Sequence, residues 1–194
     1  MGGAPHSLGI GPGVLRAVWQ VESKGNGFLP CGRTKILCEG HVFWRQLKAR
    51  GKNPSEYAKT HPTLVYPKWT ARHYRGGEKE YERLEKAMAI DRKAALRSTM
   101  WGAFQILGAN YKLCGFSDAE SFVKAQKSKE GQLRAFIKFL RARNLVDPLR
   151  KKDWQHFARV YNGPGYARYG YDKKLAKAYA RCASGAKSAE YRAK

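Results

Sequence analysis

The stretch that most constrains the fold is a predicted helix over residues 12–25, because it carries a carboxylate on its apolar face. Pro12 suits the first turn of a helix, and Gly25 suits its end. Apolar side chains at helical spacing predict the buried face: Val14, Leu15, Val18 and Val21. Glu22 follows Val18 by four residues, so it lies on the same face in the last turn.

This position disfavours the charged form of Glu22. Burial raises the pKa of a carboxyl group, and the negative end of the helix dipole raises it again. An acid that stays protonated near neutral pH can donate a proton to the alkoxide leaving group of an acetal. The alternative is a structural glutamate neutralised by a buried arginine or by hydrogen bonds. The helix alone does not separate these two interpretations.

Length and hydropathy predict one domain. A chain of 194 residues with 43% hydrophobic content can bury one core, so we expect a single domain over residues 1–194. No apolar run is long enough to cross a bilayer, and residues 1–13 lack the basic and apolar regions of a signal peptide. We therefore expect a protein made in the cytoplasm, with no transmembrane segment and no export signal.

The net charge of +23, from 38 Lys and Arg against 15 Asp and Glu, predicts a polyanionic partner. The basic residues are spread along the chain, so nucleic acid, anionic lipid, lipopolysaccharide and an anionic cell wall all fit. The charge alone does not choose among these partners.

Four cysteines are expected to be free thiols: Cys31, Cys38, Cys114 and Cys182. Two of them form a C-x6-C-x2-H array with His41. Its spacing matches no structural zinc motif, and a fourth ligand is missing. We expect no metal site and no cofactor.

The remaining periodicity is mainly helical. Apolar spacing and capping residues predict helices over residues 41–47, 78–96, 98–107, 117–123, 133–140, 153–162 and 175–182. One strand is predicted at 33–38, so the sheet content is at most a small hairpin. Residues 52–77 are expected to form a long loop, and the basic tail at 184–194 is expected to fray. The predicted fold class is mainly α.

Glu39 has two possible roles, because it follows the predicted strand and precedes a helix. It either caps backbone amides or faces a cleft opposite Glu22. The nearby loop carries aromatic residues that fit either sugar stacking or ordinary packing, and packing is the simpler interpretation: Tyr57, Tyr66, Trp69 and Tyr74. Sequence does not decide between the two roles of Glu39.

Three short motifs together resemble a known family. Glu22-Ser23 at a helix end, GAFQI at 102–106 and VYNG at 160–163 are similar to the motifs shared by goose-type lysozymes and soluble lytic transglycosylases. Longer runs around these motifs resemble the N-acetylmuramidase domain of phage endolysins, over roughly residues 12–180. The combination is specific, although each motif alone is weak.

The resemblance implies a lysozyme-like helical fold with a peptidoglycan cleft and Glu22 as the catalytic acid. It further implies that Ser23 and Gln105 contact substrate, and that Tyr161 and Asn162 hold the sugar or orient the acid. The motifs depart from the transglycosylase pattern at residues 103, 104 and 160. Many relatives carry a peptidoglycan-binding module before the catalytic domain, and about a dozen residues precede the first helix here, so we expect no such module.

The expected function is that of an endolysin that cleaves between N-acetylmuramic acid and N-acetylglucosamine. We expect hydrolysis, with Glu39 as the second carboxylate, and a monomer that resides in the host cytoplasm before lysis and acts on peptidoglycan and anionic envelope polymers. One alternative is a transglycosylase that forms 1,6-anhydro products and needs one acid only. A more distant alternative is a non-catalytic nucleic-acid-binding protein, which would give no reason for Glu22 to lie on an apolar face.

Overall fold

The structure is a computed structural model that describes residues 9–23 and 27–192, apart from the side chains of residues 23 and 184–192. The chain divides into two compact units. Unit 1 contains Met1–Gly25 and Leu140–Lys194, and unit 2 contains Asn26–Phe139. The division falls within helix α6 (Lys129–Ala142). No helix in the described part of the chain is both long and apolar enough to cross a membrane.

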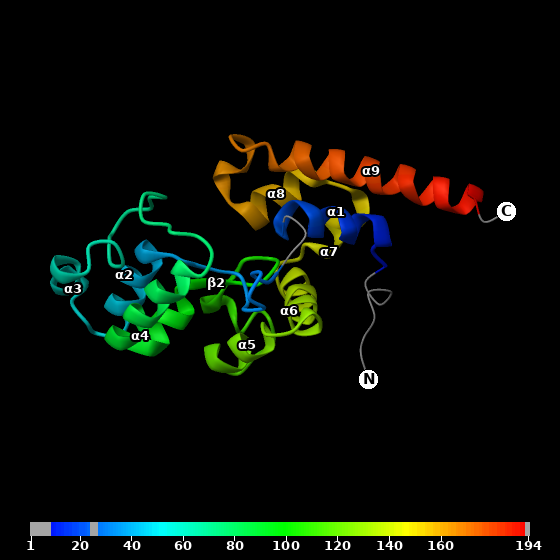
Figure 1. Cartoon of the computed structure of the whole chain (residues 1–194). Coiled ribbons are helices and arrows are strands. Elements are labelled where there is room, and N and C mark those ends of the chain that lie inside the picture. Colours follow the sequence, from blue (N-terminus) through cyan, green and yellow to red (C-terminus); the bar gives the residue numbers. More distant parts are fainter. Residues whose placement is uncertain (1–8, 24–26, 193–194) are drawn as a thin grey trace. The chain divides into compact units, whose positions relative to one another are not determined.

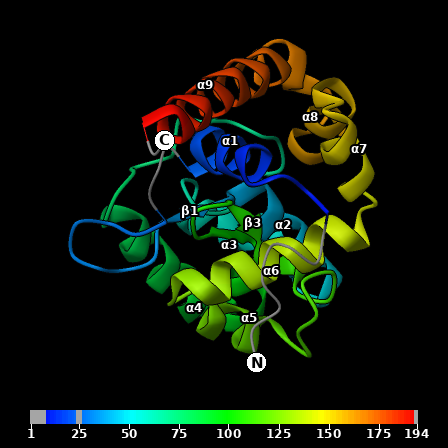
Figure 2. The ribbon, with the colours of Figure 1, turned by 90° about the vertical axis from the view of Figure 1, so that its right-hand side faces the viewer.

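Unit 1 is built on the pairing of α1 (Pro12–Ser23) with α9 (Tyr171–Arg192), which lie side by side in Figures 1 and 2. The predicted first helix is thus confirmed over its described residues. The apolar stripes of the two helices supply much of the core, with fully or almost fully buried side chains at Val14, Ala17, Val18, Leu175, Ala178 and Cys182. Burial of this seam draws the last turn of α1, and with it Glu22, toward the interior.

The rest of unit 1 is also helical. Helices α7 (Val146–Lys151) and α8 (Trp154–Asn162) precede the short 3-10 helix η3 (Pro164–Ala167). Asp153 caps α8, as predicted, by accepting a hydrogen bond from the His156 backbone N–H at 3.0 Å. The expectation of a frayed tail from residue 184 is wrong, because the backbone of α9 stays helical as far as Arg192.

Unit 2 contains a three-stranded antiparallel sheet in the order β1-β2-β3, formed by β1 (Ile36–Cys38), β2 (Thr99–Trp101) and β3 (Ile106–Leu107). Leu37 pairs with Met100, which in turn pairs with Leu107. The helix predicted over 98–107 is therefore wrong. The fold class remains mainly α, with a sheet one strand larger than a hairpin.

The turn between β2 and β3 explains why the helix predicted over 98–107 does not form. Gly102 has a φ of 72° and Gln105 a φ of 46°, which are left-handed conformations that end a right-handed helix. A Cβ at residue 102 would lie only 2.8 Å from Gln126 Oε1, so the close packing also requires glycine there. The apolar residues on either side had helical spacing by coincidence, which is the usual ambiguity of short apolar runs.

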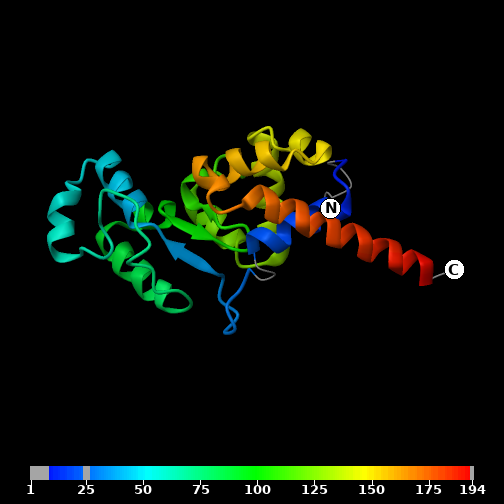
Figure 3. The ribbon, with the colours of Figure 1, turned by 90° about the horizontal axis from the view of Figure 1, so that it is seen from above.

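Helices surround this sheet in unit 2. Three of them, α2 (Gly40–Ala49), α3 (Pro54–Thr60) and α4 (Lys79–Arg97), gather at one end of the unit in Figure 3. The other elements are η2 (Gly108–Asn110), α5 (Ala119–Ala125) and α6. The predicted loop at 52–77 misses α3, which Asn53 caps and Pro54 opens. Asp118 caps α5, so the helix begins two residues after the predicted start at 117.

Asp91 holds a kink in α4, a role that the sequence did not suggest. Its backbone leaves the helical region (φ −161°, ψ 105°), and its side chain caps the following turn by accepting from the Ala94 N–H at 2.9 Å. Arg50 donates to the same carboxylate at 2.8 Å, and Lys52 lies 3.3 Å from it. Burial raises the pKa of Asp91, but these donors outweigh it and lower the pKa below its usual value.

We expect Asp91→Ala to lower the free energy of unfolding by about 2 kcal/mol, because it removes a cap and leaves the buried Ala94 N–H unpaired. Urea denaturation followed by circular dichroism measures this change. The matched control is Glu120→Ala, which removes an exposed partner of Arg92 in the same unit and should cost less than about 1 kcal/mol. Equal losses in the two variants would contradict the proposed role of the kink.

Candidate active site

Glu22 is a carboxyl group of unit 1 that is largely removed from water. It lies in the last turn of α1, beside the apolar seam with α9. Burial raises its pKa from 4.5 to about 7, and the hydrogen bond from Asn162 opposes this change only in part. A large fraction of Glu22 is therefore protonated at neutral pH, as the sequence analysis predicted.

Asn162, the last residue of α8, faces the Glu22 carboxyl group. Its Nδ2 lies 3.3 Å from both Oε1 and Oε2 of Glu22. Gly163 follows with a φ of 84° and ends the helix, so the side chain of Asn162 is held at a helix terminus. Two motifs separated by 140 residues in sequence are thereby brought together within one unit.

Tyr161 precedes Asn162 and packs against the core of unit 1. Its ring stacks on Phe157, with centroids 5.2 Å apart and planes 13° apart, and its side chain remains partly exposed. Packing therefore fixes the direction of this ring. Its contact with sugar stays a prediction.

Tyr171, at the start of α9, is a neighbour of Glu22 that the sequence analysis missed. Burial raises the pKa of the Tyr171 phenol, and the negative charge of Glu22 raises it further. The predicted final helix began at residue 175, so its first turn was left out. The Gly170-Tyr171-Asp172 sequence, with an acidic residue in the first turn, was the available signal for an earlier start.

Ser23 is the last residue of α1, and its side chain lies outside the described residues. Its predicted contact with substrate therefore stays a prediction.

Glu39, in unit 2, lies between β1 and α2 and is only 5% exposed. The Tyr74 hydroxyl donates to its Oε2 at 2.7 Å, and His41 Nδ1 lies 3.2 Å from the same oxygen. Its side chain makes no capping hydrogen bond to α2, so the capping role is wrong. Burial raises the pKa of Glu39 above its usual value, and the hydrogen bond from Tyr74 and the charge of Arg83 offset this rise only in part.

A second buried carboxylate, Glu80 of α4, holds the chain around Glu39. It is fully buried, and it accepts hydrogen bonds from the backbone N–H groups of Cys38 at 2.9 Å and Arg75 at 2.6 Å. Arg83 pairs with it at 2.7 Å and also donates to the Cys38 carbonyl at 3.1 Å. This network fixes the end of β1, and therefore the start of the Glu39 side chain. The helical pattern of residues 78–96 gave no signal for it.

Gln105 lies in the turn between β2 and β3 of unit 2. Its Nε2 donates to the Gly102 carbonyl at 2.8 Å, which braces the left-handed turn. The side chain is half-buried. This contact gives Gln105 a structural role, and its contact with substrate stays a prediction.

The aromatic residues near Glu39 are mainly packed. Tyr66 is buried and accepts a hydrogen bond from the Gly40 N–H at 3.3 Å, and Tyr74 is committed to Glu39. Trp69 differs, because it is 59% exposed and keeps a face open for stacking. Packing thus accounts for two of the four candidates, and sugar stacking by Trp69 stays a prediction.

All four cysteines are free thiols, as expected. Cys31 is exposed, whereas Cys38 is buried and its Sγ donates to the Glu80 carbonyl at 3.4 Å. Within residues 9–23 and 27–192 no cluster of three potential metal ligands occurs.

Comparisons with known proteins agree with the motifs. A family model described as Muramidase, N-acetylmuramidase, matches residues 11–183. The solved structure described as the crystal structure of Burkholderia AP3 phage endolysin is 43% identical to this chain, with a TM-score of 0.83. The similarity covers 92% of this chain and 68% of that chain. No curated protein matches the chain.

The raised pKa of Glu22 has a consequence for stability. The unfolded chain releases this proton near pH 4.5 and the folded chain near 7, so folding becomes less favourable as the pH rises through this window. We expect Glu22→Gln to raise the free energy of unfolding at pH 8 by about 3 kcal/mol and to leave it almost unchanged at pH 4.

Urea denaturation at both pH values measures this difference. Asp147→Asn is the control, because Asp147 is an exposed carboxylate of the same unit. A pH-independent effect of Glu22→Gln would contradict the assigned pKa.

Proposed function

Because the chain belongs to the N-acetylmuramidase family and is a peptidoglycan-degrading enzyme of the lysozyme type, we propose that it hydrolyses the bond between N-acetylmuramic acid and N-acetylglucosamine with Glu22 as general acid. The observation that carries this proposal is the pKa of about 7 at Glu22. Cleavage of a glycosidic bond requires proton donation to a poor leaving group, and a carboxylic acid with this pKa keeps a substantial protonated fraction near pH 7.

Asn162 orients the acid in this proposal. Its amide contacts both oxygens of Glu22, so it restricts rotation of the carboxyl group. The distance of 3.3 Å is long, which leaves the proton available for transfer to substrate. The Asn162 amide also lowers the pKa of Glu22, so it prevents burial from raising the pKa further.

We propose that Glu39 is the carboxylate that holds the attacking water molecule. Hydrolysis needs a positioned water molecule, which a second carboxylate commonly holds. The Tyr74 hydroxyl donates to Oε2 of Glu39, so this contact fixes the direction of the carboxylate. In this proposal the other oxygen, Oε1, holds the water or stabilises the positive charge of an oxocarbenium-like transition state.

The positive charge of the chain fits the anionic polymers of a bacterial envelope. A net charge of +23 raises the local concentration of such a protein at an anionic surface. The same charge also suits nucleic acid, but nucleic-acid binding gives no role to a half-buried, largely protonated glutamate.

The first test of this function is Glu22→Gln, which keeps the side-chain shape and removes the transferable proton. We expect release of soluble muropeptides from purified peptidoglycan to fall at least about 100-fold, with an unchanged circular dichroism spectrum. The control Asp147→Asn removes the same charge at an exposed position and should retain full activity. A Glu22→Gln enzyme that keeps more than a few per cent of activity would rule out the assignment.

For the wild type, we expect the rate to fall as the pH rises above about 7, because ionised Glu22 cannot donate a proton.

The second test separates hydrolysis from transglycosylation. Mass spectrometry of the muropeptides should show reducing muramic acid, whereas a transglycosylase would leave 1,6-anhydro products lighter by one water. We expect Glu39→Gln to slow the reaction at least about 100-fold, with Glu85→Gln as an exposed control in the same unit. Mainly anhydro products, or an undiminished rate in Glu39→Gln, would replace hydrolysis with transglycosylation and leave the role of Glu22 intact.

A further inference from the structure

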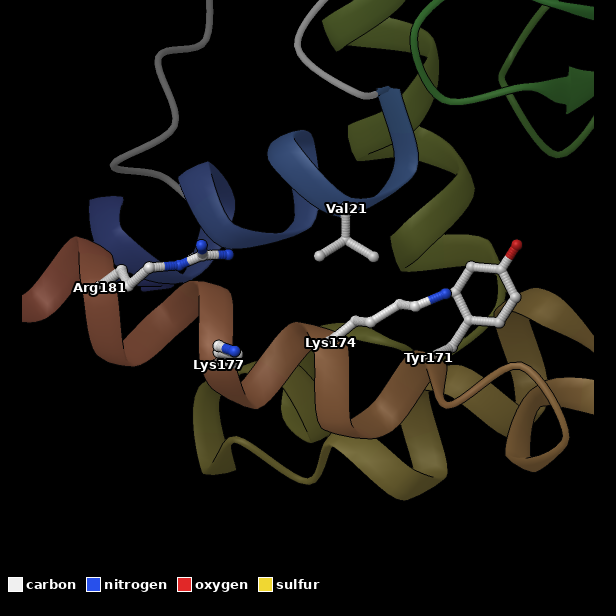
Figure 4. A pocket seen from close by; sticks show the side chains of 5 residues that line it. All are labelled: Val21, Tyr171, Lys174, Lys177 and Arg181. Atoms are coloured by element: carbon white, nitrogen blue, oxygen red, sulfur yellow. The ribbon is translucent and has the colours of Figure 1, made fainter.

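A pocket of about 320 Å³ lies between α1 and α9 in unit 1, next to the candidate acid. Figure 4 shows the side chains that line it: Val21, Tyr171, Lys174, Lys177 and Arg181. Val21 points from α1 toward α9, and the other four come from α9. The pocket thus combines an apolar wall with three cationic side chains.

The four lining residues of α9 recur every three or four positions, so they form one stripe along the helix. Tyr171 and Arg181 are ten residues apart, which is about 15 Å along an α-helix. Four residues of an extended peptide span about 13 Å. The length of the stripe therefore suits an extended peptide of four or five residues.

The positive charge of the stripe favours the binding of an anionic ligand. Lys174 and Lys177 are exposed, and neither takes part in an ion pair with any residue that the structure describes. The Lys174 Nζ lies 5.3 Å from the centre of the Tyr171 ring, so it is directed along the pocket wall. Cations gathered in this way repel one another until carboxylates or another anion neutralise them.

One end of the pocket adjoins Glu22. Val21 precedes Glu22 in α1, and Tyr171 lies close enough to Glu22 for its charge to raise the pKa of the phenol. The opposite end, at Arg181, lies farther along α9 (Figure 4). A ligand in the pocket would therefore begin beside the scissile bond and extend away from it.

We propose that this pocket binds the acidic peptide attached to the muramic acid residue whose glycosidic bond is cleaved. This inference rests on the proposed function of Glu22. The peptide is joined to that sugar through its lactyl group, so it starts near the reacting bond and carries free carboxylates. Lys174 and Lys177 would pair with these carboxylates, and Val21 and the Tyr171 ring would contact the methyl groups of its alanines.

The pocket should make the enzyme selective for glycan strands that carry peptides. The test compares kcat/KM for two substrates: soluble glycan strands with intact peptides, and the same strands after an amidase has removed the peptides. We expect wild-type enzyme to prefer the peptide-bearing strands about tenfold. We expect the double variant Lys174→Gln with Lys177→Gln to lose most of this preference, because two charge-assisted contacts are removed.

The control is the double variant Lys151→Gln with Lys173→Gln. Both lysines are exposed in unit 1 and neither lines the pocket, so the loss of net charge is the same. We expect this control to keep the wild-type preference. Equal kcat/KM of wild type on the two substrates, or the same loss in both double variants, would overturn the peptide pocket while leaving muramidase activity established. Absence of cleavage on both substrates would instead overturn the proposed function itself.

Discussion

The burial of Glu22 in the seam between α1 and α9 is the constraint on which unit 1 depends. The two helices associate through apolar stripes whose centres, Val18 and Leu175, are completely buried. Because Glu22 follows Val18 by one helical turn, the helix cannot bury its stripe without also removing this carboxyl group from water. The same packing that stabilises the unit therefore produces the unusual acid. Under the proposed function, the burial that suits Glu22 for proton donation also lowers the free energy of unfolding once the group ionises.

Glu80 in unit 2 is a buried carboxylate with a structural role, and it differs from Glu22 in its hydrogen-bond donors. Glu80 is more deeply buried than Glu22, but backbone N–H groups and the Arg83 guanidinium donate to both of its oxygens. Its charge is thus matched by donors, and the group fixes the end of β1. Glu22 receives only the two long contacts from Asn162. The difference in donors, more than the depth of burial, separates a structural carboxylate from one suited to proton transfer.

Much of unit 1 and its acid could be predicted from sequence, because the signals are local and periodic. The stripe of α1, the Asp153 cap and the Asn162-Gly163 helix end all follow from residues within a few positions of one another. The β2–β3 hairpin could not be predicted, since its turn depends on left-handed Gln105 and on the tight space around Gly102. Glu80 was missed for a related reason, because its role depends on contacts with residues distant in sequence and its own neighbours in sequence look ordinary. Tyr171 was missed because the predicted final helix began one turn too late.

The two candidate carboxylates differ in what opposes their burial, and this difference supports separate roles. At Glu22 a single weak donor opposes desolvation, and the pKa rises to about 7. At Glu39 desolvation and the charge of Glu80 also raise the pKa, and a short hydrogen bond from Tyr74 and the charges of Arg83 and Arg45 offset this rise only in part. Acid and base catalysis at one pH requires two carboxyl groups whose surroundings give them different pKa values. A group that holds water must remain ionised while its partner stays protonated. The stronger opposition to desolvation at Glu39 therefore supports the proposal that Glu22 is the acid and that Glu39 holds the water.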